Sequence, residues 1–255
     1  MEINFRDISE FIRLKVCLII SSIAICGFLL FNSLNATLIF IFLSSFFGTA
    51  GAYAFNNIND KEEDLINRKR INPFVLNKKG LLIIAVCFII SMIFITLLPT
   101  FSIVFSFFGI ISSFAYSRLK IKKYSVMKNV FTAIGVGASF LVGTTFFDMD
   151  VLWNYLIFML FIFILSLTSD LRDFEGDKKS NIGTLPVSIG YEKARIFLMI
   201  LLGIFTLNVL LTFRILVFIP FTVLMFYYLY LDKPKRVHSF GGYSLMFLAI
   251  SLFVF

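Results

Sequence analysis

The chain has 255 residues, of which 59% are hydrophobic, 18% aromatic and only 15% charged, with a formal net charge of +8. Its mean hydropathy of +0.95 lies outside the range of soluble globular domains, in which about 25% of residues are charged. This composition excludes a soluble enzyme and a nucleic-acid-binding domain. It indicates an all-α integral membrane protein that is surrounded by membrane lipid.

Nine apolar segments of about 17–20 residues are long enough to cross about 30 Å of hydrocarbon as helices. We expect them to form a single transmembrane domain over residues 1–255, with polar loops at about 56–80 and 170–193. The predicted helices cover residues 14–32, 36–56, 81–98, 100–117, 127–146, 152–169, 195–212, 215–231 and 240–255.

The charged residues gather on one side of the predicted membrane domain. With nine spans, the N-terminal segment and the loops after the even-numbered spans share one side. Together with Lys15, Lys128 and Arg195, at the starts of the spans that follow them, these segments hold 22 of the 23 Lys and Arg residues. Short loops rich in these residues stay in the cytoplasm. We therefore expect a multi-pass cell-membrane protein with a cytoplasmic N-terminus, cytoplasmic polar loops and an external C-terminus. The same segments hold 13 of the 15 acids, which this rule does not explain.

The first concentration of acids is "NNINDKEEDLINRKR", residues 56–70, with four acids and four bases directly after an uncharged span. Positions four apart lie on one face of a helix, so Asn56, Asp60 and Asp64 would point in one direction. Taken alone, such a cluster is as well explained by a solvated helix end whose acids pair with nearby bases.

The second concentration, "SDLRDFEGDKK", repeats this arrangement at the end of the sixth span, where Asp170, Asp173 and Asp177 share a helix face. Like charges stacked along a helix repel unless a cation lies between them. Carboxylate clusters suit Mg²⁺, which binds through one or two carboxylates together with substrate phosphate oxygens. Two such clusters at equivalent places favour a metal and diphosphate site over two solvated helix ends.

Bases accompany both clusters, as a diphosphate site requires, because the charge that leaves with the diphosphate must be neutralised. Most of these bases are explained by membrane topology alone. Lys120 is the exception that we single out, because it follows Tyr116 by one helical turn.

At these residues the chain resembles the UbiA superfamily of intramembrane prenyltransferases. The family's NDxxDxxxD motif appears as "NNINDKEED", its second aspartate motif as "DLRDFEGDKKSNIGTLPVSIG", and its YxxxK motif as Tyr116 to Lys120. Two departures stand out. Asn57 replaces an Asp of the first motif, and of the Arg-Pro pair usual near the first helix only Arg13 has a counterpart.

The resemblance implies a bundle of about nine helices with an active site at the cytoplasmic face. It also implies Mg²⁺-dependent transfer of an isoprenyl group from a prenyl diphosphate to a lipophilic acceptor. By the family's pattern the metal ligands would be Asn56, Asp60, Asp64, Asp170, Asp173 and Asp177. The diphosphate would be bound by Arg68, Lys120 and Arg172, and the catalytic residues would be Asp60, Tyr116, Lys120 and Asp173.

The expected acceptor is geranylgeranylglyceryl phosphate, which would receive a geranylgeranyl group in archaeal ether-lipid synthesis. The Phe-, Ile-, Lys- and Asn-rich composition resembles that of proteins from AT-rich archaeal genomes, and the second motif resembles that of the family's archaeal lipid enzymes. An aromatic acceptor of a quinone-type pathway is an open alternative. A membrane cation carrier is an alternative of another class, disfavoured because the acids lie at span ends. No obligate protein partner is expected.

Overall fold

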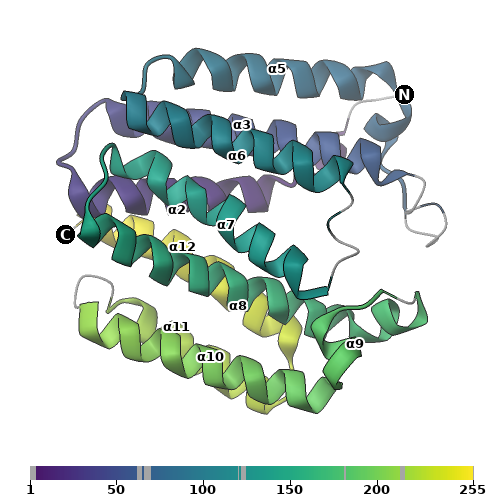
Figure 1. The fold of residues 1–255 in the computed structure, drawn as a ribbon. Coiled ribbons are helices and arrows are strands. Elements are labelled where there is room, and N and C mark those ends of the chain that lie inside the picture. Colours follow the sequence, from purple (N-terminus) through teal and green to yellow (C-terminus); the bar gives the residue numbers. More distant parts are fainter. Residues whose placement is uncertain are drawn as a thin grey trace.

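In the computed structural model the chain forms a bundle of helices that run side by side (Figure 1). The structure describes residues 4–61, 65, 70–119, 121, 125–180, 182–212 and 216–254. Within these ranges there are no strands, so the all-helical fold expected from the sequence is confirmed.

Eight helices in the described part of the chain are long and apolar enough to cross a membrane. A shorter helix, α11 (Phe218–Tyr230), covers the eighth predicted segment with 13 residues, or about 20 Å, which is less than the hydrocarbon thickness. The eight long helices are α2 (Leu14–Phe31), α3 (Thr37–Asn59), α5 (Lys78–Ile95), α6 (Thr100–Arg118), α7 (Ser125–Thr144), α8 (Met149–Lys179), α10 (Tyr191–Thr212) and α12 (Pro234–Val254).

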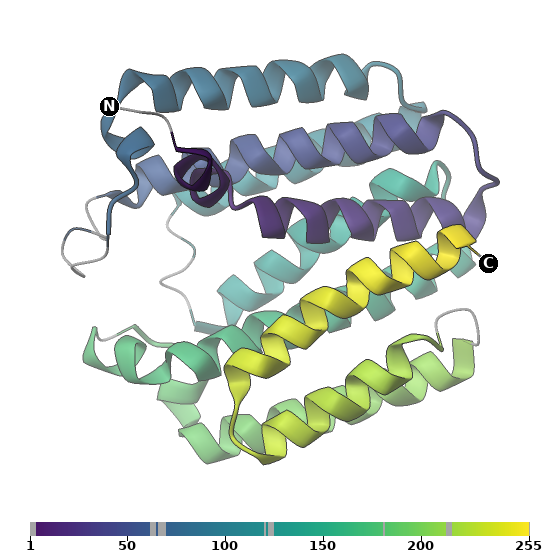
Figure 2. The ribbon, with the colours of Figure 1, turned by 180° about the vertical axis from the view of Figure 1, so that it is seen from behind.

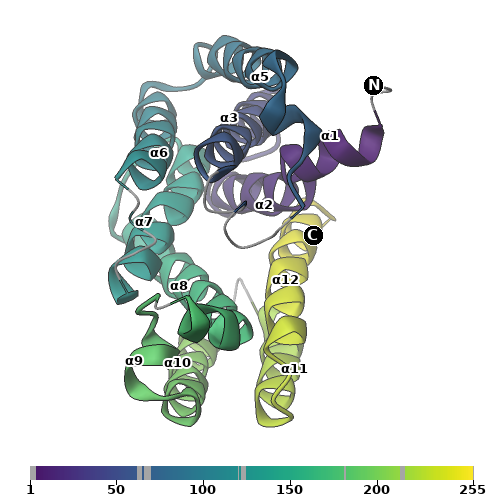
Figure 3. The same cartoon turned by 90° about the vertical axis from the view of Figure 1, so that its right-hand side faces the viewer.

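The short elements gather at one end of this bundle. These are α1 (Phe5–Phe11), the 3₁₀ turn η1 (Pro73–Leu76) and α9 (Leu185–Ile189), and they lie at the end of the bundle where α3, α6 and α8 end. We call this end, which faces the viewer in Figure 3, the motif end, because both acidic motifs lie there. The two chain termini lie at opposite ends of the bundle (Figure 1).

Helix α2 lies in the middle of the bundle and packs against α3, α7 and α12, as Figure 2 shows for α12. Its contact with α7 is made backbone to backbone. A Cβ atom added to Gly27 would collide with the carbonyl oxygen of Phe140, and one added to Gly143 would collide with that of Ala24. Small residues therefore set the distance between these helices, as is common in membranes.

Phenylalanine side chains fill the largest apolar core, which joins α8 to its neighbours. The rings of Phe161, Phe205 and Phe218 are fully or almost fully buried, and their centroids lie 4.6–5.5 Å apart. These rings serve as packing bulk between the helices.

Helix α8 is the element that carries the second motif out of the apolar layer. Its 31 residues span about 46 Å, whereas about 20 residues suffice to cross the hydrocarbon. The excess turns hold Asp170, Asp173 and Asp177 at the motif end, so the predicted span at 152–169 is extended by a further ten helical residues.

Candidate active site

Asp170 is the most deeply buried carboxylate of the second motif, with a relative exposure of 2%. Two side chains from the first turn of α7 satisfy it: the Lys128 Nζ lies 2.6 Å from one oxygen, and the Asn129 Nδ2 donates to the other at 2.9 Å. Ser166, one turn before Asp170, donates a hydrogen bond to Asn129 Oδ1 at 2.5 Å. A buried charge requires such partners, so α7 fixes the position of Asp170.

The other two acids of this motif differ in their surroundings. Asp173 is exposed and forms two parallel hydrogen bonds with Arg172, at 2.8 and 2.6 Å. Asp177 is partly buried, and its Oδ2 atom has no hydrogen-bond partner. The buried hydroxyl of Thr184, from the Thr-Leu-Pro segment, lies close enough to Asp177 to influence its pKa, but it makes no hydrogen bond of regular geometry. Unpaired buried acceptors are rare in folded proteins and call for a ligand or a function.

The first motif lies at the C-terminal end of α3, where Asp60 is the C-cap residue. Asn56 joins α3 to α6: it accepts a hydrogen bond from the Ser117 hydroxyl at 2.8 Å and donates one to Asp60 Oδ2 at 2.9 Å. Next to Ser117, the half-buried Tyr116 ring packs 6.2 Å from Phe131 of α7. The first motif is thus braced against the helix that ends in the YxxxK motif.

Asn57, which replaces an Asp of the family's motif, faces away from Asn56 and Asp60. Its Nδ2 atom donates a 2.7 Å hydrogen bond to the carbonyl oxygen of Phe11, and its Oδ1 atom accepts one from Arg13 at 3.4 Å. A carboxylate has no proton to donate to a carbonyl. The amide therefore suits this contact, which ties the end of α1 to the start of the motif.

The structure brings Asn56 and Asp60 of α3 and the three acids of α8 to the same end of the bundle (Figure 3). Three residues of the predicted site, Asp64, Arg68 and Lys120, lie outside the described residues. The roles of all ten predicted site residues stay predictions.

Three residues that surround the second motif were not singled out from the sequence: Lys128, Asn129 and Ser166. Thr184 belongs to the quoted motif, but no role was assigned to it. Asn129 and Ser166 carry a weak signal, since each is a polar residue within an apolar helix, and such residues are expensive unless paired. Lys128 carries none, because a base at the cytoplasmic start of a span is explained by topology. Its contact with Asp170 joins positions 42 residues apart, which only the fold brings together.

Within the described ranges, no group of three His, Cys, Asp or Glu side chains is arranged to hold a metal ion. Basic partners explain in part why these acids do not converge on one point, since Lys128 and Arg172 are paired with oxygens of Asp170 and Asp173. The oxygens nevertheless fit Mg²⁺, because the Oδ2 atom of Asp177 is unpaired and hard cations prefer carboxylate ligands. The two acids beside it could exchange a basic partner for the metal.

Comparison with known proteins then decides the family. The sequence pattern of the UbiA prenyltransferase family matches residues 16–250. The chain belongs to the UbiA prenyltransferase family. A digeranylgeranylglyceryl phosphate synthase from Saccharolobus solfataricus is 32% identical to it in an alignment 225 positions long, which covers 79% of each chain. The resemblance noted in the motifs is thereby confirmed over almost the whole length.

Solved structures show the same fold. One described as a digeranylgeranylglyceryl phosphate synthase has a TM-score of 0.72 at 22% identity, covering 98% of this chain and 97% of its own. A UbiA homologue from Archaeoglobus fulgidus, bound to DMAPP and Mg²⁺, has a TM-score of 0.74 at 15% identity, covering 97% and 98%. As a UbiA family member with eight long apolar helices in its described part, the protein is a multi-pass membrane prenyltransferase.

Proposed function

We propose that the protein transfers a geranylgeranyl group from geranylgeranyl diphosphate to the free hydroxyl of geranylgeranylglyceryl phosphate. The observation that supports this reaction best is that two polar motifs lie at the same end of an otherwise apolar bundle. A substrate with a charged head and an isoprenoid tail needs such a boundary. The identity to a digeranylgeranylglyceryl phosphate synthase over 79% of the chain supports the acceptor.

In this proposal the diphosphate lies between the two motifs with Mg²⁺, which would neutralise its charge. The ligands would come from Asn56, Asp60, Asp64, Asp170, Asp173 and Asp177, and Asp177 contributes the unpaired oxygen that the structure offers. The UbiA homologue of the same fold from Archaeoglobus fulgidus is bound to DMAPP and Mg²⁺, which supports the donor class and the metal.

The chain's own groups would then bind and orient the leaving diphosphate. Arg172, now paired with Asp173, can turn to the diphosphate when that carboxylate takes a metal. Tyr116, Lys120 and Arg68 would contact the remaining oxygens, as the family's pattern implies. The C1–O bond breaks with its electron pair on the diphosphate, the acceptor's hydroxyl oxygen bonds to C1, and the hydroxyl proton is released. Charge stabilisation on the leaving group supplies most of the barrier reduction in such steps.

Neighbouring side chains keep the acids in position for this role. Asn56 and Ser117 orient Asp60, and Lys128 and Asn129 orient Asp170, each through hydrogen bonds of 2.6–2.9 Å. A site whose ligands are held before the substrate arrives loses less entropy on binding.

We further propose that residues 1–255 form one transmembrane domain and that the motif end faces the cytoplasm. The concentration of Lys and Arg in the N-terminal segment and the motif-end loops supports this orientation. A cation carrier is disfavoured, since the described carboxylates lie within ten residues of a helix end and ion pathways use residues near the midplane.

The test is product formation by purified protein in detergent, with geranylgeranyl diphosphate and either geranylgeranylglyceryl phosphate or 4-hydroxybenzoate. We expect a diether phosphate that forms with Mg²⁺ and not with EDTA, and no product with Asp60→Ala or Asp173→Ala at unchanged thermal stability. A prenylated aromatic product would support the prenyltransferase activity and show that the acceptor proposed here is wrong. Retained turnover in either variant would refute the proposal that the two motifs form the active site.

A further inference from the structure

A second polar site lies at the motif end, beside the first motif. It is a cavity of about 230 Å³ between α1, the end of α3 and residues 70–75. Its polar lining comes from Glu10, Arg13, Asn57, Lys61, Arg70 and Asn72. None of these residues belongs to the metal or diphosphate sets described above.

Three cations from different parts of the fold line this cavity: Arg13, Lys61 and Arg70. Arg13 joins α1 to α2 in the left-handed backbone conformation, with φ of 52°, which is uncommon for a residue other than glycine. Its guanidinium lies 5.1 Å from the centre of the Tyr53 ring and donates to Asn57 Oδ1. Such strain is often found at binding sites, where the surrounding contacts maintain it.

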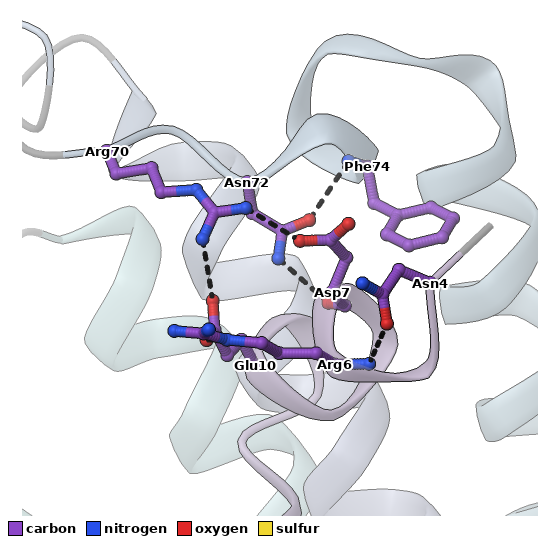
Figure 4. Close-up of polar contacts among 7 residues, drawn as sticks. All are labelled: Asn4, Arg6, Asp7, Glu10, Arg70, Asn72 and Phe74. Carbon is purple, nitrogen blue, oxygen red and sulfur yellow. Dashed lines mark hydrogen bonds and ion pairs between the residues drawn. The ribbon is translucent and has the colours of Figure 1, made fainter. Parts of the chain in front are cut away.

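Hydrogen bonds fix the opposite wall, as Figure 4 shows. Arg70 pairs with Asp7 at 3.0 Å and lies 3.9 Å from Glu10. Asn72 donates to the backbone oxygen of Asp7 at 2.8 Å and accepts from the backbone N–H of Phe74 at 3.0 Å. The cavity is therefore built before any ligand enters it.

The charge of the lining favours an anion. Glu10 is its one acid, and it is already paired with Arg6 at 2.8 Å. This hydrogen bond to Arg6, helped by the charges of Arg6 and Arg70, keeps the pKa of the Glu10 carboxyl below its usual value. Arg70 is balanced by Asp7 and Glu10, so the charge that the lining offers to an anion comes mainly from Arg13 and Lys61. Two cations beside the amides of Asn57 and Asn72 are an arrangement that binds phosphate.

The cavity also lies on a different face of α3 from the first motif. Asn57 and Lys61 form one stripe, whereas Asn56 and Asp60 form the neighbouring stripe, about 100° around the helix. The stripe of Asn56 and Asp60 faces α6, where Ser117 bonds to Asn56. The stripe of Asn57 and Lys61 faces α1, where Asn57 bonds to Phe11. Two anions could therefore bind side by side at the end of α3, as a reaction between two phosphorylated lipids requires.

We propose that this cavity binds a phosphate monoester, namely the phosphate of the acceptor lipid. The assignment to the acceptor rests on the function proposed above. The donor's diphosphate is assigned to the carboxylate stripe, where a metal can bind, and the cavity contains only one carboxylate. The site would select acceptors by their phosphate and hold the glycerol hydroxyl near the donor.

Steady-state kinetics with Lys61→Gln and Arg70→Gln test this proposal, and Lys79→Gln, at an exposed position of the same end, is the matched control. Loss of one charge-assisted contact should raise KM for geranylgeranylglyceryl phosphate about tenfold. KM for the donor should stay unchanged, and Lys79→Gln should behave as wild type. With the dephosphorylated acceptor, wild type and variants should have equal KM. A rise in the donor's KM instead would overturn the proposal.

A binding assay without donor or Mg²⁺ separates the possible sources of the phosphate. Glycerol 1-phosphate should raise the unfolding temperature of the wild type and leave both cavity variants unaffected. An equal response to inorganic phosphate, or protection by nanodiscs of anionic but not neutral phospholipid, would reject the acceptor in favour of a free ion or a headgroup. If the enzyme does not prenylate geranylgeranylglyceryl phosphate, the proposed function fails, and this assay still decides whether the cavity binds a phosphate monoester.

Discussion

Replacing Lys128 by Met removes the cation from the buried pair with Asp170 and leaves all other charges unchanged. Asp170 is 2% exposed, and among the described side chains its carboxylate would keep only the hydrogen bond from Asn129. Breaking a buried ion pair from one side costs about 3–5 kcal/mol. For a chain of this length we therefore expect the unfolding temperature to fall by roughly 6–20 °C.

The assay is thermal unfolding in detergent with EDTA, for the wild type, Lys128→Met, Asp170→Asn and the double variant. Asp170→Asn should cost less, about 1–3 kcal/mol, because the Lys128 side chain is 18% exposed and can reach water. The double variant should recover most of the loss, because no unpaired buried charge remains. Lys79→Met removes an exposed charge and should stay within about 0.5 kcal/mol of wild type.

Adding Mg²⁺ to the same assay tests whether Asp170 is a metal ligand. If Asp170 is a metal ligand, Mg²⁺ can replace the missing cation, so it should stabilise Lys128→Met more than the wild type and should not stabilise the double variant. A Lys128→Met protein as stable as the wild type in EDTA would refute the reasoning, as would a double variant no more stable than Lys128→Met.

Three further predictions follow from single contacts. Asn57→Asp should lower the free energy of unfolding by about 1–3 kcal/mol, because a carboxylate cannot donate to the Phe11 carbonyl; equal stability in thermal unfolding would contradict this account of the departure. Asp177→Asn should raise the Mg²⁺ concentration needed for half-maximal turnover without lowering the unfolding temperature, since the lost charge has no hydrogen-bond partner at Oδ2; an unchanged Mg²⁺ requirement would exclude it as a ligand. Gly143→Val should destabilise the protein by about 1–3 kcal/mol through its contact with α2, whereas Gly109→Val, where a Cβ meets nothing within 4 Å, should not, and similar unfolding temperatures would reject the backbone contact.

Most of the fold could be predicted from the sequence because the bilayer imposes strict conditions on it. Apolar segments of spanning length become helices, since backbone groups in hydrocarbon must bond within their own segment. The segment predicted at 215–231 is the exception, because α11 as described begins only at Phe218. Hydropathy measures the apolar length of a segment, whereas the end of a helix depends on local backbone contacts.

The site was predictable only in part, for a related reason. The periodicity of Asp170, Asp173 and Asp177 showed a shared helix face, which the structure confirms as a continuous helix to Lys179. It could not show that these three acids differ: one is paired with α7, one with its neighbour Arg172, and one has an unpaired oxygen. Those differences depend on side chains from other helices.

Asn57 illustrates the same limit. In the sequence it is a missing carboxylate of the metal motif, and its effect on metal binding could not be judged. In the structure its amide bonds to Phe11 and Arg13, 46 and 44 residues earlier, on a face turned away from Asn56. The Asn at position 57 therefore serves the contact between α1 and α3.

The sequence by itself determined the membrane class, the helical segments, the two motifs and the family, because each of these depends on composition or on spacing within one helix. Only the tertiary structure decided which base meets which acid, which carboxylate oxygen is left unpaired, and that Arg13, Lys61 and Arg70 line one cavity. Contacts between residues far apart in the chain depend on how the helices pack, and that packing is set by many small contacts, such as Gly27 against Phe140, which leave no periodic pattern in the sequence.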